Sequence, residues 1–213
     1  MIINTIEDIK LLDINEEIYR LNINLDVKDF KLFENYKNKI YILDISDNNF
    51  NSFEFIHFNV EILICNNNKL TSFQYLPENV IQVECDNNYI TSFQYLPNSV
   101  DTLFCNHNNI STFQYLPINI KHLYCDYNYF TSFQYLPNSI KYLHCDYNYI
   151  TSFRYLPKNI YELRCDNNCI TSFKYLPKNI KSLFCNNNQI NSFRYLPKNI
   201  NILFCSNNQI NSF

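Results

Sequence analysis

The sequence predicts a repeat solenoid that is mainly β, and three observations carry this prediction. From residue 40 onward the chain aligns with itself at a period of 20 residues without an insertion. Early in each unit, apolar residues alternate with polar or variable ones, as in a short strand with one buried face. Later in the unit comes a Leu-Pro pair, which favours an extended segment over a helix.

The repeat divides the chain into two parts. One unit runs from Val60 to Asn79, and the next ones begin at Val80, Val100, Ile120, Ile140, Ile160, Ile180 and Ile200. Residues 40–59 are a weaker copy without the Tyr-Leu-Pro, and residues 20–39 are weaker still. We therefore expect an N-terminal cap with a degenerate first repeat at 1–39. A solenoid of eight full repeats and one partial repeat is expected at 40–213.

The motif of the unit is similar to a known one. Its first eleven positions read I/V-x-x-L-x-C-x-x-N-x-I/L/F. This resembles the leucine-rich-repeat signature, with Cys in place of the third Leu. The second half, F-x-Y-L-P-x-N/S-I/V, resembles the LPxLP-class repeats of bacterial effectors and the Asn- and Phe-rich repeats of giant-virus and slime-mould proteins. The resemblance covers residues 40–213. It implies a right-handed coil with short parallel strands on a concave face and extended convex segments.

The buried side chains explain why the units must stack. Each unit offers seven inward positions, in one case Val60, Leu63, Cys65, Asn68, Leu70, Phe73 and Leu76. Burying the six apolar ones yields roughly 10–18 kcal/mol. Ordering twenty residues costs about 20–40 kcal/mol of backbone entropy. A lone unit therefore does not fold, whereas stacking buries both faces of every coil. Strands are expected at 62–64, 82–84 and onward.

Two columns of the repeat are interpreted as structural. Asn recurs at 48, 68, 88, 108, 128, 148, 168, 188 and 208, where a buried amide would bond the backbone of its own and the adjacent coil. Cys recurs at 65, 85, 105, 125, 145, 165, 185 and 205. Neighbours on in-register parallel strands are too far apart for an ideal disulfide, and a straight row is not tetrahedral as zinc requires. We expect reduced core thiols. Cys169, which lies outside the column, is the one thiol with a chance of reactivity.

No residue pattern predicts catalysis. The chain contains no Gly, which excludes Gly-rich phosphate loops. His144 and Cys145 are neighbours on a predicted strand, so they face opposite ways and do not form a nucleophile–base pair. His107 and His122 are interpreted as single loop or surface histidines. The sequence therefore predicts no enzyme, no cofactor and no metal site.

Charge and the chain ends bear on partners and location. The net charge of −3 predicts no nucleic-acid partner. No segment has the length of a membrane span, and the N-terminus lacks signal-peptide features. An intracellular protein in a host cytoplasm is expected. Residues 1–100 carry −8 and residues 101–213 carry +5. This asymmetry suggests weak head-to-tail self-association, or it is an unselected property of a solvated surface. No C-terminal cap is visible, so fraying, contact with another molecule and truncation all stay open.

The candidate site lies where the repeat varies most. On the strands' concave side the middle units place seven aromatic residues: Phe104, His122, Tyr124, Tyr127, Tyr142, His144 and Tyr147. Exposed aromatic clusters are typical of interaction hot spots. The alternative is that A/T-rich codons supply Tyr and Phe everywhere. A more regular Tyr column, at 75, 95, 115, 135, 155, 175 and 195, is expected to pack on the neighbouring coil.

Three functions remain open from the sequence. The leading one is a non-enzymatic protein-protein interaction scaffold that binds a protein partner on its concave face. The second is the substrate-recognition arm of a ubiquitin-ligase or effector system, which acts through a separate catalytic partner. The third is an expanded repeat with no specific ligand.

Overall fold

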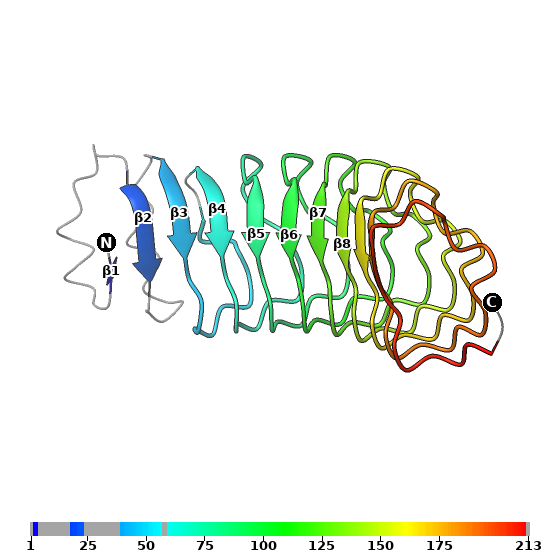
Figure 1. Cartoon of the computed structure of the whole chain (residues 1–213). Helices are drawn as coiled ribbons and strands as arrows, with labels where there is room; N and C mark the ends of the chain where they lie inside the picture. Colours follow the sequence, from blue (N-terminus) through cyan, green and yellow to red (C-terminus); the bar gives the residue numbers. More distant parts are fainter. Residues whose placement is uncertain (1, 4–17, 24–38, 57–58, 212–213) are drawn as a thin grey trace.

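The chain forms one parallel sheet whose strands follow each other in sequence order (Figure 1). The computed structural model describes residues 2–3, 18–23, 39–56 and 59–211. The strands are β1 (Ile2–Ile3), β2 (Ile18–Ile23), β3 (Ile40–Asp44), β4 (Val60–Ile64), β5 (Gln82–Glu84), β6 (Thr102–Phe104), β7 (His122–Tyr124), β8 (Tyr142–His144), β9 (Glu162–Arg164), β10 (Ser182–Phe184) and β11 (Ile202–Phe204). No helix occurs in these ranges, which confirms the predicted β solenoid.

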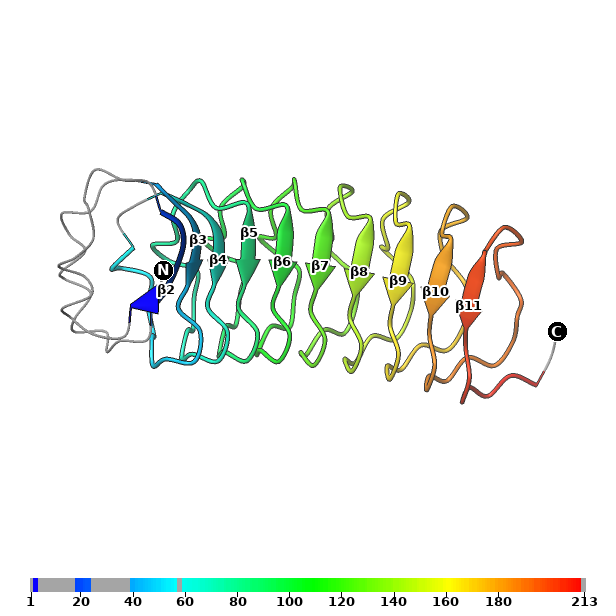
Figure 2. The same ribbon diagram turned by 60° about the vertical axis from the view of Figure 1, so that its left-hand side comes forward.

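The pairing register equals the sequence period. Leu63 lies opposite Val83, and Leu103 lies opposite Leu123, each 20 residues further along the chain. The same offset holds from β3 to β11, so every coil repeats the one before it (Figure 2). Because register is exact, each column of the repeat becomes a row of side chains running along the solenoid.

The core consists of the predicted inward positions. Val60, Leu63, Cys65, Leu70 and Phe73 are fully buried, and the equivalent residues of the following coils are buried in the same way. Leu76 and its equivalents close the core on the side away from the sheet. The prediction of the core is therefore confirmed, apart from the last coil, where these columns are partly exposed.

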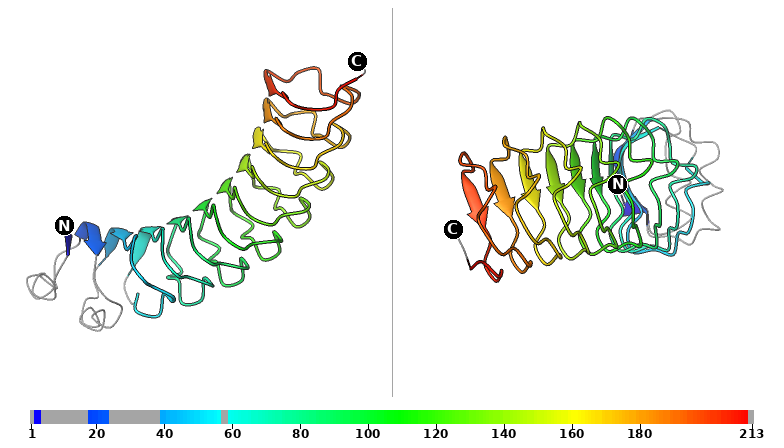
Figure 3. Two further views of the ribbon diagram at one scale, coloured as in Figure 1. Left: turned by 90° about the horizontal axis from the view of Figure 1, so that it is seen from below. Right: turned by 90° about the vertical axis from the view of Figure 1, so that its right-hand side faces the viewer.

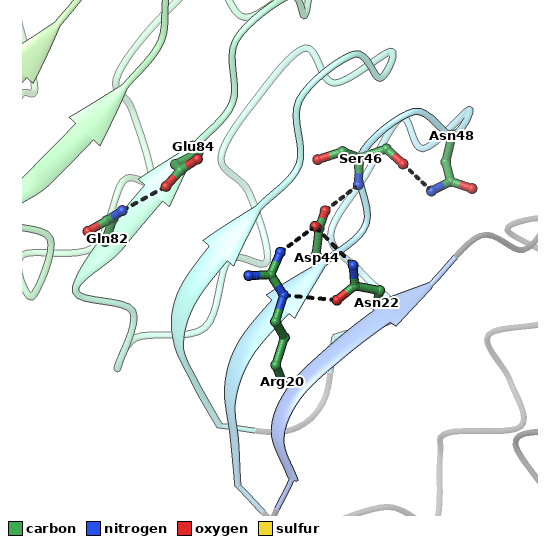
Figure 4. Close-up of polar contacts among 7 residues, drawn as sticks. All are labelled: Arg20, Asn22, Asp44, Ser46, Asn48, Gln82 and Glu84. Atoms are coloured by element: carbon green, nitrogen blue, oxygen red, sulfur yellow. Dashed lines mark hydrogen bonds and ion pairs between the residues drawn. The ribbon is translucent and has the colours of Figure 1, made fainter. Parts of the chain in front are cut away.

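A ladder of Asn side chains ties the coils together. The amide of Asn88 donates to the carbonyl oxygens of Cys85 and of Cys65 in the preceding coil, at 3.1 and 3.0 Å. Its Oδ1 accepts from the N–H of Leu70 at 3.0 Å. The donor pattern begins at Asn48, whose amide reaches the carbonyl of Ser46 (Figure 4). The structural interpretation of this column is confirmed.

The rod is curved, with the strands on its inner side (Figure 3). Ring spacing measures this curvature. On the strands, Phe104 and Tyr124 have centroids 4.3 Å apart. In the core behind them, Phe93 and Phe113 are 6.5 Å apart. The same period of 20 residues is thus compressed on the concave side and expanded on the convex side.

Each full coil turns twice through positive φ without using Gly. One turn places Asn67 at φ 55°, and the other places Tyr75 at φ 68°. In the second turn the N–H of Leu76 donates to the carbonyl of Phe73 at 3.1 Å. The Tyr75 ring is 57% exposed, and the other residues of its column behave alike. The expectation that this column packs on the neighbouring coil is wrong, because the turn directs its side chains into solvent.

The N-terminal segment continues the sheet. β2 pairs in parallel with β3, and β1 pairs with β2. Leu21 and Ile23 belong to the core. Most of the predicted cap at 1–39 lies outside the described residues, so the division at residue 39 stays a prediction.

Candidate partner-binding surface

Seven aromatic side chains gather on the middle of the concave face. We call this set the aromatic surface: Phe104, His122, Tyr124, Tyr127, Tyr142, His144 and Tyr147. Five of them belong to strands β6, β7 and β8 and are half-buried by their neighbours. Tyr127 and Tyr147 follow β7 and β8 and are 43% and 46% exposed. The period of 20 residues brings all seven into rows, as the sequence predicts.

Two of the rows lie on the strands. In the first, the rings of Phe104 and Tyr124 stack at 4.3 Å, and His144 meets Tyr124 edge-on at 4.6 Å. In the second, His122 and Tyr142 stack at 4.8 Å. Offset or edge-on packing at these distances is favourable for aromatic rings. Both rows are therefore ordered before any partner arrives.

The third row lies just beyond the strands. Tyr127 stacks on Tyr147 at 4.2 Å, and on its other side His107 stacks on Tyr127 at 4.2 Å. A hydrogen bond with Tyr147 raises the pKa of the Tyr127 phenol. These three residues occupy the positive-φ turn where most other coils have Asn, a residue better suited to that backbone. The fold therefore does not require aromatic residues here.

The structure adds three residues that the predicted site omits. His107 extends the third row, although the sequence interpretation treats it as a single histidine. Tyr161 lies 5.8 Å from Tyr142. Glu162 accepts from Arg164 at 3.1 Å and lies 3.4 Å from His144. His107 shares its column with Tyr127, so the period itself was a signal that could have found it.

The two ends of the aromatic surface are polar. Towards the C-terminus, Arg164 lies over the Phe184 ring at 4.5 Å. Burial, together with this guanidinium, lowers the pKa of His144, which favours the neutral imidazole. Towards the N-terminus, Gln82 donates to Glu84 at 2.7 Å, and Arg20 bonds Asp44 at 3.1 Å (Figure 4). The concave face thus changes from charged to aromatic and back along the rod.

A row of carboxylates lies next to the third aromatic row. Asp126, Asp146 and Asp166 follow the buried cysteines of three consecutive coils. Burial raises the pKa of Asp126 to about 6. Burial, followed by the Asp126 carboxylate, raises the pKa of Asp146 to about 7. These groups titrate near neutrality because each is partly buried beside another negative charge.

The cysteine column is core, as predicted. All nine cysteines are free thiols, and seven are buried. Burial raises the pKa of Cys125 and Cys145 well above the ordinary thiol value. The Cys145 sulfur donates to the carbonyl of Arg164 at 3.2 Å, whereas the His144 ring faces Tyr124 and Glu162. The two neighbours point apart. Cys169 is partly exposed.

Metal and membrane features were sought in the same ranges. Over the described residues, no three His, Cys, Asp or Glu side chains are grouped so that they could hold a metal ion. The described part of the chain also has no helix long and apolar enough to cross a membrane.

Comparisons with solved structures place the fold among leucine-rich-repeat proteins. An internalin from Listeria monocytogenes is similar with a TM-score of 0.69 and 17% identity over 92% of this chain. The effector YopM from Yersinia pestis has a TM-score of 0.65 and 20% identity over 99%. A chain in the octameric complex of latrophilin 3, Unc5D and the leucine-rich-repeat part of FLRT2 has a TM-score of 0.66 and 24% identity over 81%. This chain spans 65%, 61% and 62% of their respective lengths.

These likenesses show the fold. No protein-family model matches the sequence, and the search of curated proteins finds no match. Proteins of this fold are typically protein-interaction modules, and the FLRT2 complex contains protein partners. One similar structure, of a TLR13–ssRNA13 complex, has RNA as the partner (TM-score 0.63, 20% identity, 89% of this chain and 33% of that one). The resemblance to giant-virus and slime-mould repeats stays a prediction.

Proposed function

We propose that this protein is a non-enzymatic interaction scaffold that binds a protein partner on its aromatic surface. The observation that carries the proposal is the preordered set of stacked rings on β6–β8 and in the turns that follow them. Rigid aromatic side chains contribute large contact area at a small cost in conformational entropy. The leucine-rich-repeat fold is consistent with this role because its members mainly bind other molecules.

Codon bias alone does not account for this surface. Such a bias would spread Tyr over every solvent-exposed column. The turn after the strand instead carries Asn in five described coils and Tyr in only two consecutive ones. Those two adjoin the aromatic strand positions. The coincidence of three aromatic rows in the same coils supports one binding surface.

Affinity capture tests the proposal. Wild-type protein and a variant with Tyr124→Ser and Tyr142→Ser would be used to capture proteins from a lysate of cells in which the protein occurs. The matched control is Tyr115→Ser with Tyr135→Ser, which removes two exposed rings from the convex side. We expect the captured partner to be lost only from the first variant. Equal capture by all three proteins would contradict binding on the aromatic surface.

The same experiment addresses the alternative function. A recognition arm of a ubiquitin-ligase system would also capture a ligase or a ubiquitin-conjugating enzyme, through a surface that the Tyr124 and Tyr142 changes leave intact. The nine unpaired cysteines support an intracellular, reducing location for either function.

A further inference from the structure

A second set of surface features lies on the convex side, where the exposed Tyr column forms grooves. Tyr155 and Tyr175 wall a groove of about 450 Å³, and Tyr175 and Tyr195 wall the next one, of about 670 Å³. The Leu-Pro pairs lie between them, and Lys158, Lys178 and Lys198 stand among the lining residues. We call these two the basic grooves.

The shape of these grooves recurs along the rod, but their charge does not. Tyr75 and Tyr95 wall a similar groove of about 570 Å³, lined by Glu78 and Asn98 and by no basic residue. The residues before Tyr75, Tyr95, Tyr115 and Tyr135 are all Gln, whereas the last three units have Arg154, Lys174 and Arg194. The fold therefore supplies the shape, and six basic residues are added to it in three consecutive units.

These six cations are not neutralised within the described part of the chain. All are exposed, and none forms an ion pair there. Residues 150–160, 170–180 and 190–200 contain no Asp or Glu. Arg154, Lys174 and Arg194 each lie over the adjacent Tyr ring, at 4.8, 4.9 and 4.9 Å. The grooves thus combine aromatic walls with unpaired positive charge, which attracts anions.

The spacing of the coils on this side selects among anions. The Phe153, Phe173 and Phe193 rings, just ahead of the tyrosines, are 6.4 and 6.2 Å apart. In an extended peptide, side chains on one face recur every two residues, at about 6.4–6.8 Å. One acidic side chain would then meet each coil. The strands of a nucleic-acid duplex carry charges about 3.4 Å apart and lack this match.

We propose that the basic grooves bind an extended acidic peptide segment with Asp or Glu at every second position. The segment lies along the convex side, and successive carboxylates meet Lys158, Lys178 and Lys198. Arg154, Lys174 and Arg194 hold the other edge. This site is separate from the aromatic surface and does not depend on it.

Two labelled peptides of equal composition test the spacing. One alternates Glu and Ser over nine residues, and the other has the same Glu residues in one block. Fluorescence anisotropy at physiological salt should show the alternating peptide binding more tightly, by about tenfold. Equal affinity for both peptides would overturn the proposal, because a diffuse positive field does not distinguish them.

Variants test the grooves themselves. Lys158→Asn with Lys178→Asn copies the residue at Asn98, and Arg154→Gln with Lys174→Gln copies Gln94, so the fold already accommodates both changes. Each variant should weaken the alternating peptide by about tenfold or more. Lys121→Asn with Lys141→Asn removes the same charge elsewhere and should change affinity less than threefold. An equal loss in this control would contradict the proposal.

A gain-of-binding variant completes the design. Gln74→Arg, Glu78→Lys, Gln94→Lys and Asn98→Lys transfer the basic residues to the Tyr75–Tyr95 groove. We expect a second equivalent of alternating peptide to bind. Tighter binding of a single-stranded oligonucleotide or of anionic vesicles, lost in the same groove variants, would assign the grooves to another partner and overturn the peptide proposal.

Discussion

The backbone N–H of Asp146 donates to a carboxylate oxygen of Asp126, 2.7 Å away in the preceding coil. The same contact recurs from Asp166 to Asp146 at 2.6 Å. At the equivalent place Asn106 accepts from the N–H of Asp126 at 2.8 Å, so an uncharged amide serves the fold equally well. The fold requires an acceptor here, and the negative charge is an additional cost.

We predict that Asp146→Asn stabilises the protein at pH 8. The pKa of Asp146 is raised from 3.8 to about 7, mainly by burial and then by Asp126. Between these values the folded state binds more protons than the unfolded state, so stability falls as pH rises from about 4 to 7. Removing the carboxylate should recover about 1–2 kcal/mol, a discounted figure because water screens this partly exposed group. Urea unfolding at pH 5 and pH 8 measures the effect.

A favourable contact should also form in this variant. The Asn186 amide donates to Asp166 at 3.0 Å, and the amide introduced at position 146 would be placed to do the same towards Asp126. The wild-type protein should lose stability between pH 5 and pH 8, and the variant should lose less. If both proteins respond identically to pH, the carboxylate row does not titrate in this range.

The Asn ladder predicts a large loss of stability for Asn128→Ala. Its Oδ1 accepts from the buried N–H of Ile110 at 3.0 Å, and its amide donates to Cys105 and Asp126. Leaving such groups unpaired costs about 2–4 kcal/mol in total. Asn208→Ala, in the partly exposed last coil, should cost less than half as much. Chemical denaturation of the two variants compares them, and equal losses would mean that the ladder is not the cause.

The fold was readable from the sequence because a single period determines strands, register and core together. Leu63, Cys65 and Asn68 each stand for a whole row once the coils stack. The aromatic surface was readable for the same reason, since Tyr124 and Tyr142 belong to columns on one face. What the period alone does not contain is curvature, which makes spacing 4.3 Å at Phe104 and 6.5 Å at Phe93.

The exposed Tyr column shows a second limit. A regular apolar or aromatic column suggests packing, and positive φ is normally signalled by Gly or Asn. Tyr75 adopts φ 68° in a chain without Gly, so no residue type marked the turn. The outward direction of its ring, and with it the convex grooves, follows from the backbone and not from the pattern.

Thiol labelling should separate the cysteines into two groups. Cys169 and Cys205 are partly exposed, whereas the other seven are buried and those thiols have raised pKa values. Since the thiolate is the reactive form, alkylation of native protein at pH 8 should modify Cys169 first and Cys205 more slowly. Mass spectrometry of the peptides identifies the sites. Modification of Cys125 before unfolding would contradict the packed core.

The third aromatic row predicts that stability and binding can be separated. Tyr127 and Tyr147 occupy positive φ at 54° and 53°, where Asn87 and Asn167 stand in other coils. Changing both to Asn relieves backbone strain of about 1 kcal/mol per residue but removes ring stacking of about 0.5–1.5 kcal/mol per pair. The unfolding free energy should stay within about 1 kcal/mol of wild type. Loss of partner capture by this stable variant would assign the rings to binding; retained capture would remove this row from the proposed surface.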